Sequence, residues 1–248
     1  MSSVEDDDDV SRETSAREQA ESFFGDRLPL ALAYATLLRT DGIDHGLIGP
    51  REGDRLWSRH LLNCAVLREV VEPTHLVADV GSGAGLPGIP LAIAVPGLHV
   101  TLIEPLERRA AFLVAAVDSL GLTDQLDVVH ARAEDRPDLN ASFDVVTARA
   151  LAPLAGLLGW TVPLAKVGGR VIAMKGAKVR EELAAARREL RRYGVQEWRV
   201  HSLGQGIVAP PTTVVEFVVG ERPQPKTAKP GRRRSGTSAT ERRGGRRS

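Results

Sequence analysis

Cysteine is nearly absent from this chain of 248 residues, which holds a single thiol at Cys64. One cysteine excludes an intramolecular disulfide and any zinc site built from several cysteines. The N-terminus lacks a basic region followed by an apolar one, and no apolar run approaches the ~20 residues of a membrane-spanning helix. The six histidines are scattered, so we expect no metal site. Together these absences predict a reducing, cytoplasmic location without membrane contact.

The formal net charge of +1 conceals two ends of opposite sign. Residues 1–26 carry nine acids against two arginines, whereas residues 221–248 carry ten bases against two acids. Neither end shows apolar periodicity, and such polar segments bury too little apolar surface to offset the entropy lost on ordering. We therefore expect an acidic disordered tail over residues 1–21 and a basic disordered tail over residues 221–248.

The chain between the tails divides into two parts. Residues 22–73 are rich in Leu and Ala at near-helical spacing and predict a small helical cap. Residues 74–220 alternate strand-like runs with helical stretches, which is typical of a doubly wound, Rossmann-like α/β sheet. The last two strands have no helix between them, so this C-terminal hairpin adds one antiparallel strand to a mostly parallel sheet. The expected strands are 76–80, 98–103, 126–130, 143–147, 170–174, 195–203 and 212–220, and the expected helices are 88–94, 107–120, 151–165 and 178–193.

A glycine-rich turn, "VADVGSGAGLPGIP" (77–90), follows the first expected strand. Its G-x-G-x-x-G spacing fits a dinucleotide as well as S-adenosylmethionine. Two features favour S-adenosylmethionine. Asp79 precedes the first glycine, as in the E/D-x-G-x-G-x-G motif of methyltransferases, and Pro87 and Pro90 stand where a pyrophosphate needs free amides.

Each part of S-adenosylmethionine has a candidate partner in this pattern. We expect Asp79 to face the ammonium group and Glu104, at the end of the second strand, to face the ribose hydroxyls. Ala133 and Glu134 follow the third strand and are expected beside the adenine. The glycines at Gly83 and Gly85, with their neighbours, leave bare backbone next to the ligand.

Several segments occur in an order that carries a family resemblance. They resemble the RsmG (GidB) family of bacterial 16S ribosomal RNA guanine-N7 methyltransferases over roughly residues 25–220. The resemblance implies S-adenosylmethionine as methyl donor and 16S ribosomal RNA, at guanine 527, or the assembling small subunit as partner. The segments are "RHLLN" (59–63), "DVGSGAGLPGIPLAI" (79–93), "IEPLERRAAFL" (103–113), "FDVVTARALAPLAGLLGW" (143–160) and "VIAMKG" (171–176). The cofactor contacts that it implies are Gly81, Leu86, Ala133, Glu134 and Arg149.

The residues at the end of the fourth strand bear on which atom is methylated. This chain has Arg149 there and lacks the Asn/Asp-Pro-Pro-aromatic turn of enzymes that methylate base amino groups. Methylation at carbon 5 of a pyrimidine needs a thiol, and Cys64 lies in an apolar helix as an expected buried hydrophobe. Guanine N7 has an in-plane lone pair and no proton to lose, so its methylation needs placement and no general base. We expect Arg149 to position the nucleotide.

Basic residues predict the RNA side. Arg59 and His60 lie in the "RHLLN" segment, and Lys175 ends the fifth strand at the same sheet edge as Arg149. The arginines of the basic tail, represented by Arg232, Arg233 and Arg234, are expected to neutralise ribosomal RNA phosphates. We expect the protein to be monomeric. Where the family has an acidic residue and a serine after "RHLL", this chain has Asn63 and Cys64.

Three alternatives stay open at this point. A methyltransferase could act on another RNA site or on a small molecule. An NAD-dependent oxidoreductase would need a proton donor, but the chain has no Tyr-x-x-x-Lys, and Tyr34 and Tyr193 are expected in helices away from the strand ends. A non-catalytic RNA-binding module would keep the basic tail and have no need of the glycine turn.

Overall fold

The computed structural model describes residues 2–221. Arg232, Arg233 and Arg234 of the expected basic tail lie outside the described residues, so their part in RNA binding stays a prediction. Within the described range, none of the helices combines the length and apolar character needed to cross a bilayer.

Seven strands form a single sheet in the order β3-β2-β1-β4-β5-β7-β6. Strands β1 to β5 run parallel, whereas β7 pairs antiparallel with both β5 and β6. This arrangement confirms the prediction of a mostly parallel, doubly wound sheet with one antiparallel strand from a C-terminal hairpin. The strands are β1 (Leu76–Val80), β2 (His99–Glu104), β3 (Leu126–His130), β4 (Phe143–Arg149), β5 (Ala165–Lys175), β6 (Val195–Leu203) and β7 (Thr212–Val219).

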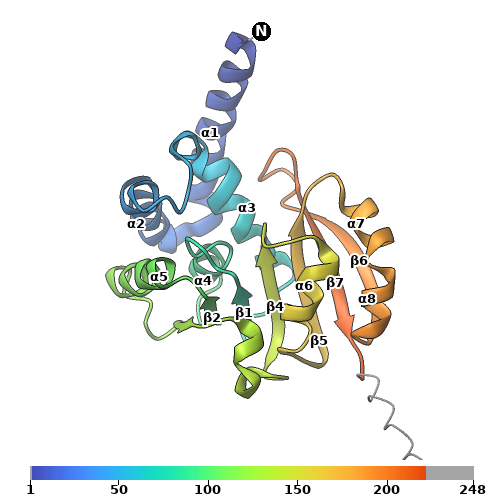
Figure 1. The fold of residues 1–248 in the computed structure, drawn as a ribbon. Coiled ribbons are helices and arrows are strands. Elements are labelled where there is room, and N and C mark those ends of the chain that lie inside the picture. The colour runs from blue at the N-terminus through green and yellow to red at the C-terminus, as the bar shows by residue number, and fades with distance from the viewer. Residues whose placement is uncertain (1, 222–248) are drawn as a thin grey trace, which may run out of the picture.

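Apolar side chains alternate between the two faces of the sheet. In β1, Val77 belongs to one hydrophobic cluster and Ala78 to a second, and Val145 and Val146 of β4 divide in the same way. Successive strand residues point to opposite faces, so each face needs its own cover. The first face is covered by α4 (Gly88–Ala94), α5 (Glu107–Ser119) and the cap, and the second by α6 (Leu154–Thr161), α7 (Val179–Ala185) and α8 (Arg187–Arg192), as Figure 1 shows.

Two expected helices differ from the observed ones at their ends. The helix expected over 151–165 is α6, which begins after Pro153 and ends at Thr161. Proline at a helix start is harmless because its missing N–H would have no partner there. The helix expected over 178–193 is divided into α7 and α8 at Ala186. Two short turns of 3-10 helix follow β3, namely η6 (Ala133–Asp135) and η7 (Pro137–Leu139).

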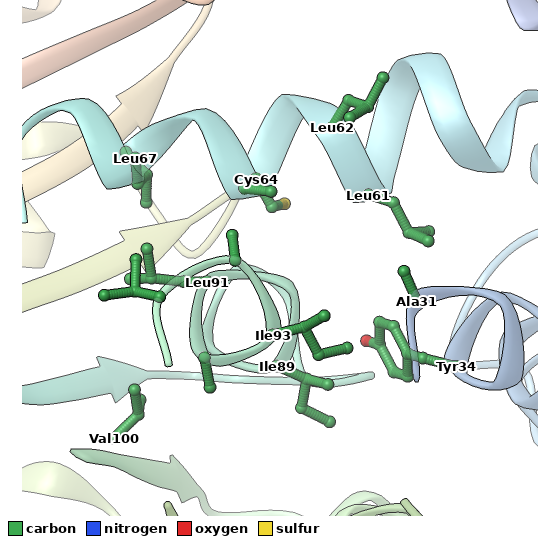
Figure 2. Close-up of a cluster of buried hydrophobic side chains, with 14 of the residues drawn as sticks. Ala31, Tyr34, Leu61, Leu62, Cys64, Leu67, Ile89, Leu91, Ile93 and Val100 are labelled. Carbon is green, nitrogen blue, oxygen red and sulfur yellow. The ribbon is translucent and has the colours of Figure 1, made fainter. Parts of the chain in front are cut away.

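The cap consists of short helical segments that pack on α4. Figure 2 shows Tyr34 from α2 and Leu61 from η4 on the same side of α4 as Ile89 and Ile93. All four side chains are buried and belong to the cluster that also contains the first face of the sheet. The cap and the sheet therefore share one core. The cap segments are α1 (Ser2–Phe24), η1 (Gly25–Arg27), α2 (Leu28–Leu37), η2 (Leu38–Gly42), η3 (Pro50–Arg55), η4 (Leu56–Leu61), α3 (Leu62–Ala65) and η5 (Val66–Glu69).

The prediction of an acidic disordered tail over residues 1–21 is wrong for residues 2–21, which belong to helix α1. Ala16, Ala20 and Phe24 recur every four residues and are buried, so they form a short apolar stripe on one helix face. Composition arguments missed this stripe because the acidic residues dominate the average. The N-terminal part of α1 projects away from the sheet in Figure 1.

Candidate functional site

The glycine turn after β1 has the backbone conformation that its residues predict. Gly81, Gly83 and Gly85 have φ values of 71°, 60° and 96°, which glycine adopts without strain. A Cβ atom on Gly81 would lie 2.5 Å from Cδ1 of Leu151. The amide of Gly81 donates to the carbonyl oxygen of Ile103 on β2 at 2.8 Å, which ties the turn to the neighbouring strand.

Two buried carboxylates hold the ends of this turn. Glu104 is 1% exposed, and its Oε2 and Oε1 accept from the amides of Gly83 at 2.9 Å and Leu106 at 3.0 Å. Asp79 is fully buried and accepts through Oδ2 from the amide of Gly88 at 3.0 Å, while its Oδ1 has no partner among the described residues. Burial raises the pKa of Asp79 to about 7. The predicted contacts of Asp79 and Glu104 with cofactor stay predictions.

Tyr34 also reaches this turn. Its fully buried hydroxyl donates to the carbonyl oxygen of Ala84 at 2.7 Å, and burial raises the pKa of the phenol, so it stays a donor. The expectation that Tyr34 lies away from the strand ends is therefore wrong. It does lie in a helix, but α2 is brought against the turn by the shared core. No local sequence signal links these two residues, which are 50 positions apart.

A small cavity of about 90 Å³ opens beside the turn at the ends of β1, β2 and β3. It brings together three of the predicted cofactor residues, Gly81, Ala133 and Glu134. Leu151 and Trp160 form part of its opposite wall. The predicted contact Leu86 does not line this cavity and packs against the hydrophobic cluster of the first sheet face.

Arg149 ends β4 and joins it to the cap. Its Nη2 donates to the carbonyl oxygen of Arg59 and to Nδ1 of His60, both at 2.9 Å, and its Nη1 donates to Sγ of Cys64 at 3.0 Å. Cys64 is fully buried, as predicted. The "RHLLN" segment and the end of β4 therefore meet through one guanidinium, and the sequence analysis had predicted only that both lie on the RNA side.

His60 is held from both sides of its ring. A guanidinium can only donate, so Nδ1 accepts from Arg149, and Nε2 carries the hydrogen that Glu52 Oε2 accepts at 2.7 Å. Burial, followed by the charge of Arg149, lowers the pKa of His60 to about 4 and keeps the ring neutral. His60 therefore holds one side of the Arg149 guanidinium, and its predicted contact with RNA stays a prediction. Arg59 keeps an exposed side chain 3.6 Å from Glu52.

A second, larger cavity of about 920 Å³ has Arg149 in its wall. It includes Arg59, Arg149 and Lys175 from the predicted RNA side. Lys175 is 9% exposed, and its Nζ donates to the carbonyl oxygen of Ala152 at 2.6 Å and to Glu182 Oε2 at 2.9 Å. The sequence analysis missed Glu182. The other lining residues come from the cap, β4, β5 and the β6–β7 connection: Arg55, Ser58, Asn63, Ala150, Ala152, Pro153, Met174, Gly176, Ala177, Ala209, Pro210, Pro211, Thr212 and Thr213.

The 150–152 segment separates the two cavities. Leu151 lines the smaller one, and Ala150 and Ala152 line the larger one. Ala150 has a φ of 50°, a left-handed conformation that is uncommon for residues other than glycine. Such outliers cluster at sites where function constrains the backbone. In the described part of the chain, no group of three or more histidine, cysteine, aspartate or glutamate side chains could hold a metal ion.

Comparison with known families decides between the alternatives left open above. A family model described as "GidB: rRNA small subunit methyltransferase G" matches residues 27–209. The chain belongs to this family. Among its relatives, the ribosomal RNA small subunit methyltransferase G of Salinispora tropica is 52% identical in an alignment of length 226 that covers 87% of this chain and 93% of the relative. The protein of the same name from Mycolicibacterium smegmatis is 48% identical and covers 91% of this chain and 93% of its own.

Solved structures show the same fold at low identity. TYW2 of M. jannaschii, solved in complex with AdoMet, has a TM-score of 0.51 and 20% identity over 67% of this chain and 78% of its own. TYW2 of P. horikoshii, solved in complex with MeSAdo, has a TM-score of 0.50 and 18% identity over 64% and 61% of the two chains. These structures share the Rossmann-like sheet that the sequence of this chain predicts.

Proposed function

We propose that this chain transfers a methyl group from S-adenosylmethionine to N7 of a guanine in 16S ribosomal RNA, namely guanine 527. Methylation of small-subunit ribosomal RNA is the activity named for the family to which the chain belongs. The observation that carries the proposal is the pair of cavities on either side of the 150–152 segment. The smaller one is lined by residues predicted to contact the methyl donor, and the larger one has room for a nucleotide.

The residues around the smaller cavity fit S-adenosylmethionine. The ligand supplies a methyl group bonded to a positively charged sulfur. Glu134 lines this cavity and would accept from the adenine amino group. Glu104 ends β2 outside the cavity lining and has lone pairs left for the ribose hydroxyls. The unpartnered Oδ1 of Asp79 would accept a hydrogen bond from the ammonium group of the ligand. The absence of a side chain at Gly81 lets Leu151 pack directly against the turn, where a Cβ atom would lie 2.5 Å from its Cδ1.

The larger cavity suits a base that reacts without a proton acceptor. Guanine N7 takes the methyl group through its own lone pair and gains a positive charge, and the sulfur keeps the electrons of the broken carbon–sulfur bond. The titratable groups near Arg149 agree with this chemistry. Both nitrogens of His60 are engaged, and the burial of Cys64 raises the pKa of its thiol. The residues present can orient a base, which is what in-line transfer requires.

The test of this proposal compares two matched RNA substrates. Small subunits would be reconstituted with guanine or 7-deazaguanine at the target position, and tritium from methyl-labelled S-adenosylmethionine would be counted. We expect transfer to guanine and none to the 7-deaza analogue, which has carbon in place of N7. Transfer to both would place the methyl group on another atom. Transfer to free RNA or to a small molecule with the target guanine unlabelled would support the alternative substrates.

Two further expectations are part of the same proposal. We propose that the protein acts as a monomer, which sedimentation at several concentrations would test. We also propose that it works in the cytoplasm, where its ribosomal substrate is assembled. A stable dimer, or recovery of the protein mainly with membranes after cell fractionation, would contradict these expectations.

A further inference from the structure

Glu182 places a carboxylate in the wall of the larger cavity. It lies in the first turn of α7, and its side chain is 27% exposed. Its Oε2 accepts from Lys175 Nζ and from the amide of Leu154, both at 2.9 Å. Its Oε1 has no hydrogen bond to any residue between 2 and 221. The carboxylate is thus fixed through one oxygen and has the other available to a ligand.

The charge state of this pair is set by its contacts. Burial alone would raise the pKa of Glu182, but the hydrogen bonds from Lys175 and Leu154 outweigh it and hold the pKa below its usual value. Glu182 is therefore an ionised acceptor at neutral pH. Lys175 has three N–H donors, of which two go to Ala152 and Glu182, so one is left.

These groups match the Watson–Crick edge of guanine. The Watson–Crick edge of guanine presents N1–H and N2–H as donors beside O6 as acceptor. A carboxylate can accept from both donors, and a neighbouring ammonium can donate to O6. Adenine has an acceptor at N1 and no amino group at C2, so it would leave Oε1 of Glu182 without a donor. A site built to accept from a base N–H discriminates strongly against a base that lacks it.

The order of the strands also favours this orientation of the base. The smaller cavity lies at β1, β2 and β3, Arg149 ends β4, and Lys175 ends β5, next to α7. In a purine, N7 and the N1–N2 edge lie on opposite sides of the ring system. A guanine whose N7 faces the smaller cavity would therefore turn its N1–N2 edge toward β5 and Glu182.

We infer that Glu182 selects the target base by accepting from N1–H and N2–H of guanine, with Lys175 donating to O6. This inference rests on the function proposed above. Glu182 then has a second role in the reaction, because the methylated ring becomes positively charged and its N1–H becomes a stronger donor. A fixed carboxylate at that edge stabilises the charge as it develops. Lys175, which the sequence predicts on the RNA side, then contacts the base itself.

The experiment compares E182Q with E181Q on two substrates. Glu181 is the exposed neighbour of Glu182 on α7, so E181Q removes the same charge outside the cavity. Small subunits would carry guanine or inosine at the target position, since inosine lacks only the amino group at C2. The kcat/KM of each enzyme would be measured on each substrate, with affinity for S-adenosylmethionine and the melting temperature as controls of the fold.

We expect wild type and E181Q to prefer guanine over inosine by roughly tenfold or more. E182Q should lose roughly 10²-fold in kcat/KM on guanine, because a neutral amide cannot accept from both donors or offset the ring charge, and its preference should fall toward one. A folded E182Q with an unchanged preference would overturn the inference. Wild type that does not distinguish the two bases would overturn it too, even if E182Q fails to fold. Absence of any guanine methylation by wild type would instead overturn the proposed function.

Discussion

The smaller cavity, beside Gly81, is lined mainly by residues at the ends of β1, β2 and β3, together with Leu151 and Trp160. The larger cavity, beside Arg149, draws on the cap, the ends of β4 and β5 and the β6–β7 hairpin. Thr212 in its wall donates to the carbonyl oxygen of Asn63, 149 positions away, and Arg149 donates to Arg59 across 90 positions. The first cavity can therefore be changed by local substitutions in the turn, and the second depends on how the cap, the sheet edge and the hairpin meet. The predictions below separate the two.

The largest effect is expected from Arg149→Ala. This change removes the hydrogen bonds from the end of β4 to Arg59, His60 and Cys64 of the cap. Turnover should fall on the order of 10²-fold even at saturating RNA, because a small misplacement of reacting groups has an effect of that size. Arg149→Lys should recover only part of the activity, since an ammonium lacks the planar fork. Full turnover of Arg149→Ala at saturation would show that the base is placed by other residues.

A smaller effect, confined to the glycine turn, is expected from Asp79→Asn. The folded protein binds the Asp79 proton more tightly than the unfolded chain, because burial raises the pKa to about 7. The wild-type free energy of unfolding should therefore fall relative to the variant as pH rises from roughly 4 to 7, by at most about 1.4 kcal/mol per pH unit. Urea unfolding at several pH values would measure it. Parallel stability curves for the two proteins would mean that Asp79 is ionised throughout.

Tyr34→Phe should weaken the support that the cap gives to the glycine turn. The variant keeps the ring in the core but leaves the carbonyl oxygen of Ala84 without its donor, at a cost of about 1–3 kcal/mol in stability. Affinity for S-adenosylmethionine should fall, and the KM for RNA should stay the same. Calorimetry and steady-state kinetics would measure the two quantities. An increase in the KM for RNA alone would assign Tyr34 to the larger cavity.

The smallest effect is expected from Glu13→Ala, which alters the support of η4 in the wall of the larger cavity. The carboxylate of Glu13 accepts from the amides of Trp57 and Ser58, at 2.8 and 3.0 Å, and so caps the start of η4. Its loss should reduce stability by about 1 kcal/mol and raise the KM for RNA a few-fold without changing cofactor affinity. Glu18→Ala on the exposed face of α1 is the control. Equal behaviour of the two variants would rule out a role for the cap in placing η4.

The sequence predicts best what depends on neighbouring residues. The strands and the turn were predictable because apolar runs and glycines at fixed spacing specify them locally. The helix over residues 2–21 was missed because its packing depends on only three residues, Ala16, Ala20 and Phe24. The average composition of the segment is acidic and conceals them. The start of α6 after Pro153 was misplaced because apolar periodicity continues into the 150–152 segment.

The candidate site divides in the same way. Gly81, Ala133 and Glu134 were predicted as a group and line one cavity. Glu182 and Tyr34 were missed because each acts through a contact that only the tertiary structure creates. Lys175 was predicted at the correct strand end, but its ion pair with Glu182 could not be anticipated from a lysine and a glutamate seven positions apart with a turn between them.

The shared core of the cap and α4 also affects how the chain folds while it is being synthesised. The ribosome makes the cap first, yet the cap residues Tyr34 and Leu61 pack on Ile89 and Ile93, which emerge later. Until α4 leaves the exit tunnel, the apolar side chains of the cap have no surface to cover them, and exposed apolar surface of this kind favours aggregation. The nascent cap is thus a segment for which we expect chaperone binding to be strongest before residue 94 is exposed and to decline afterwards.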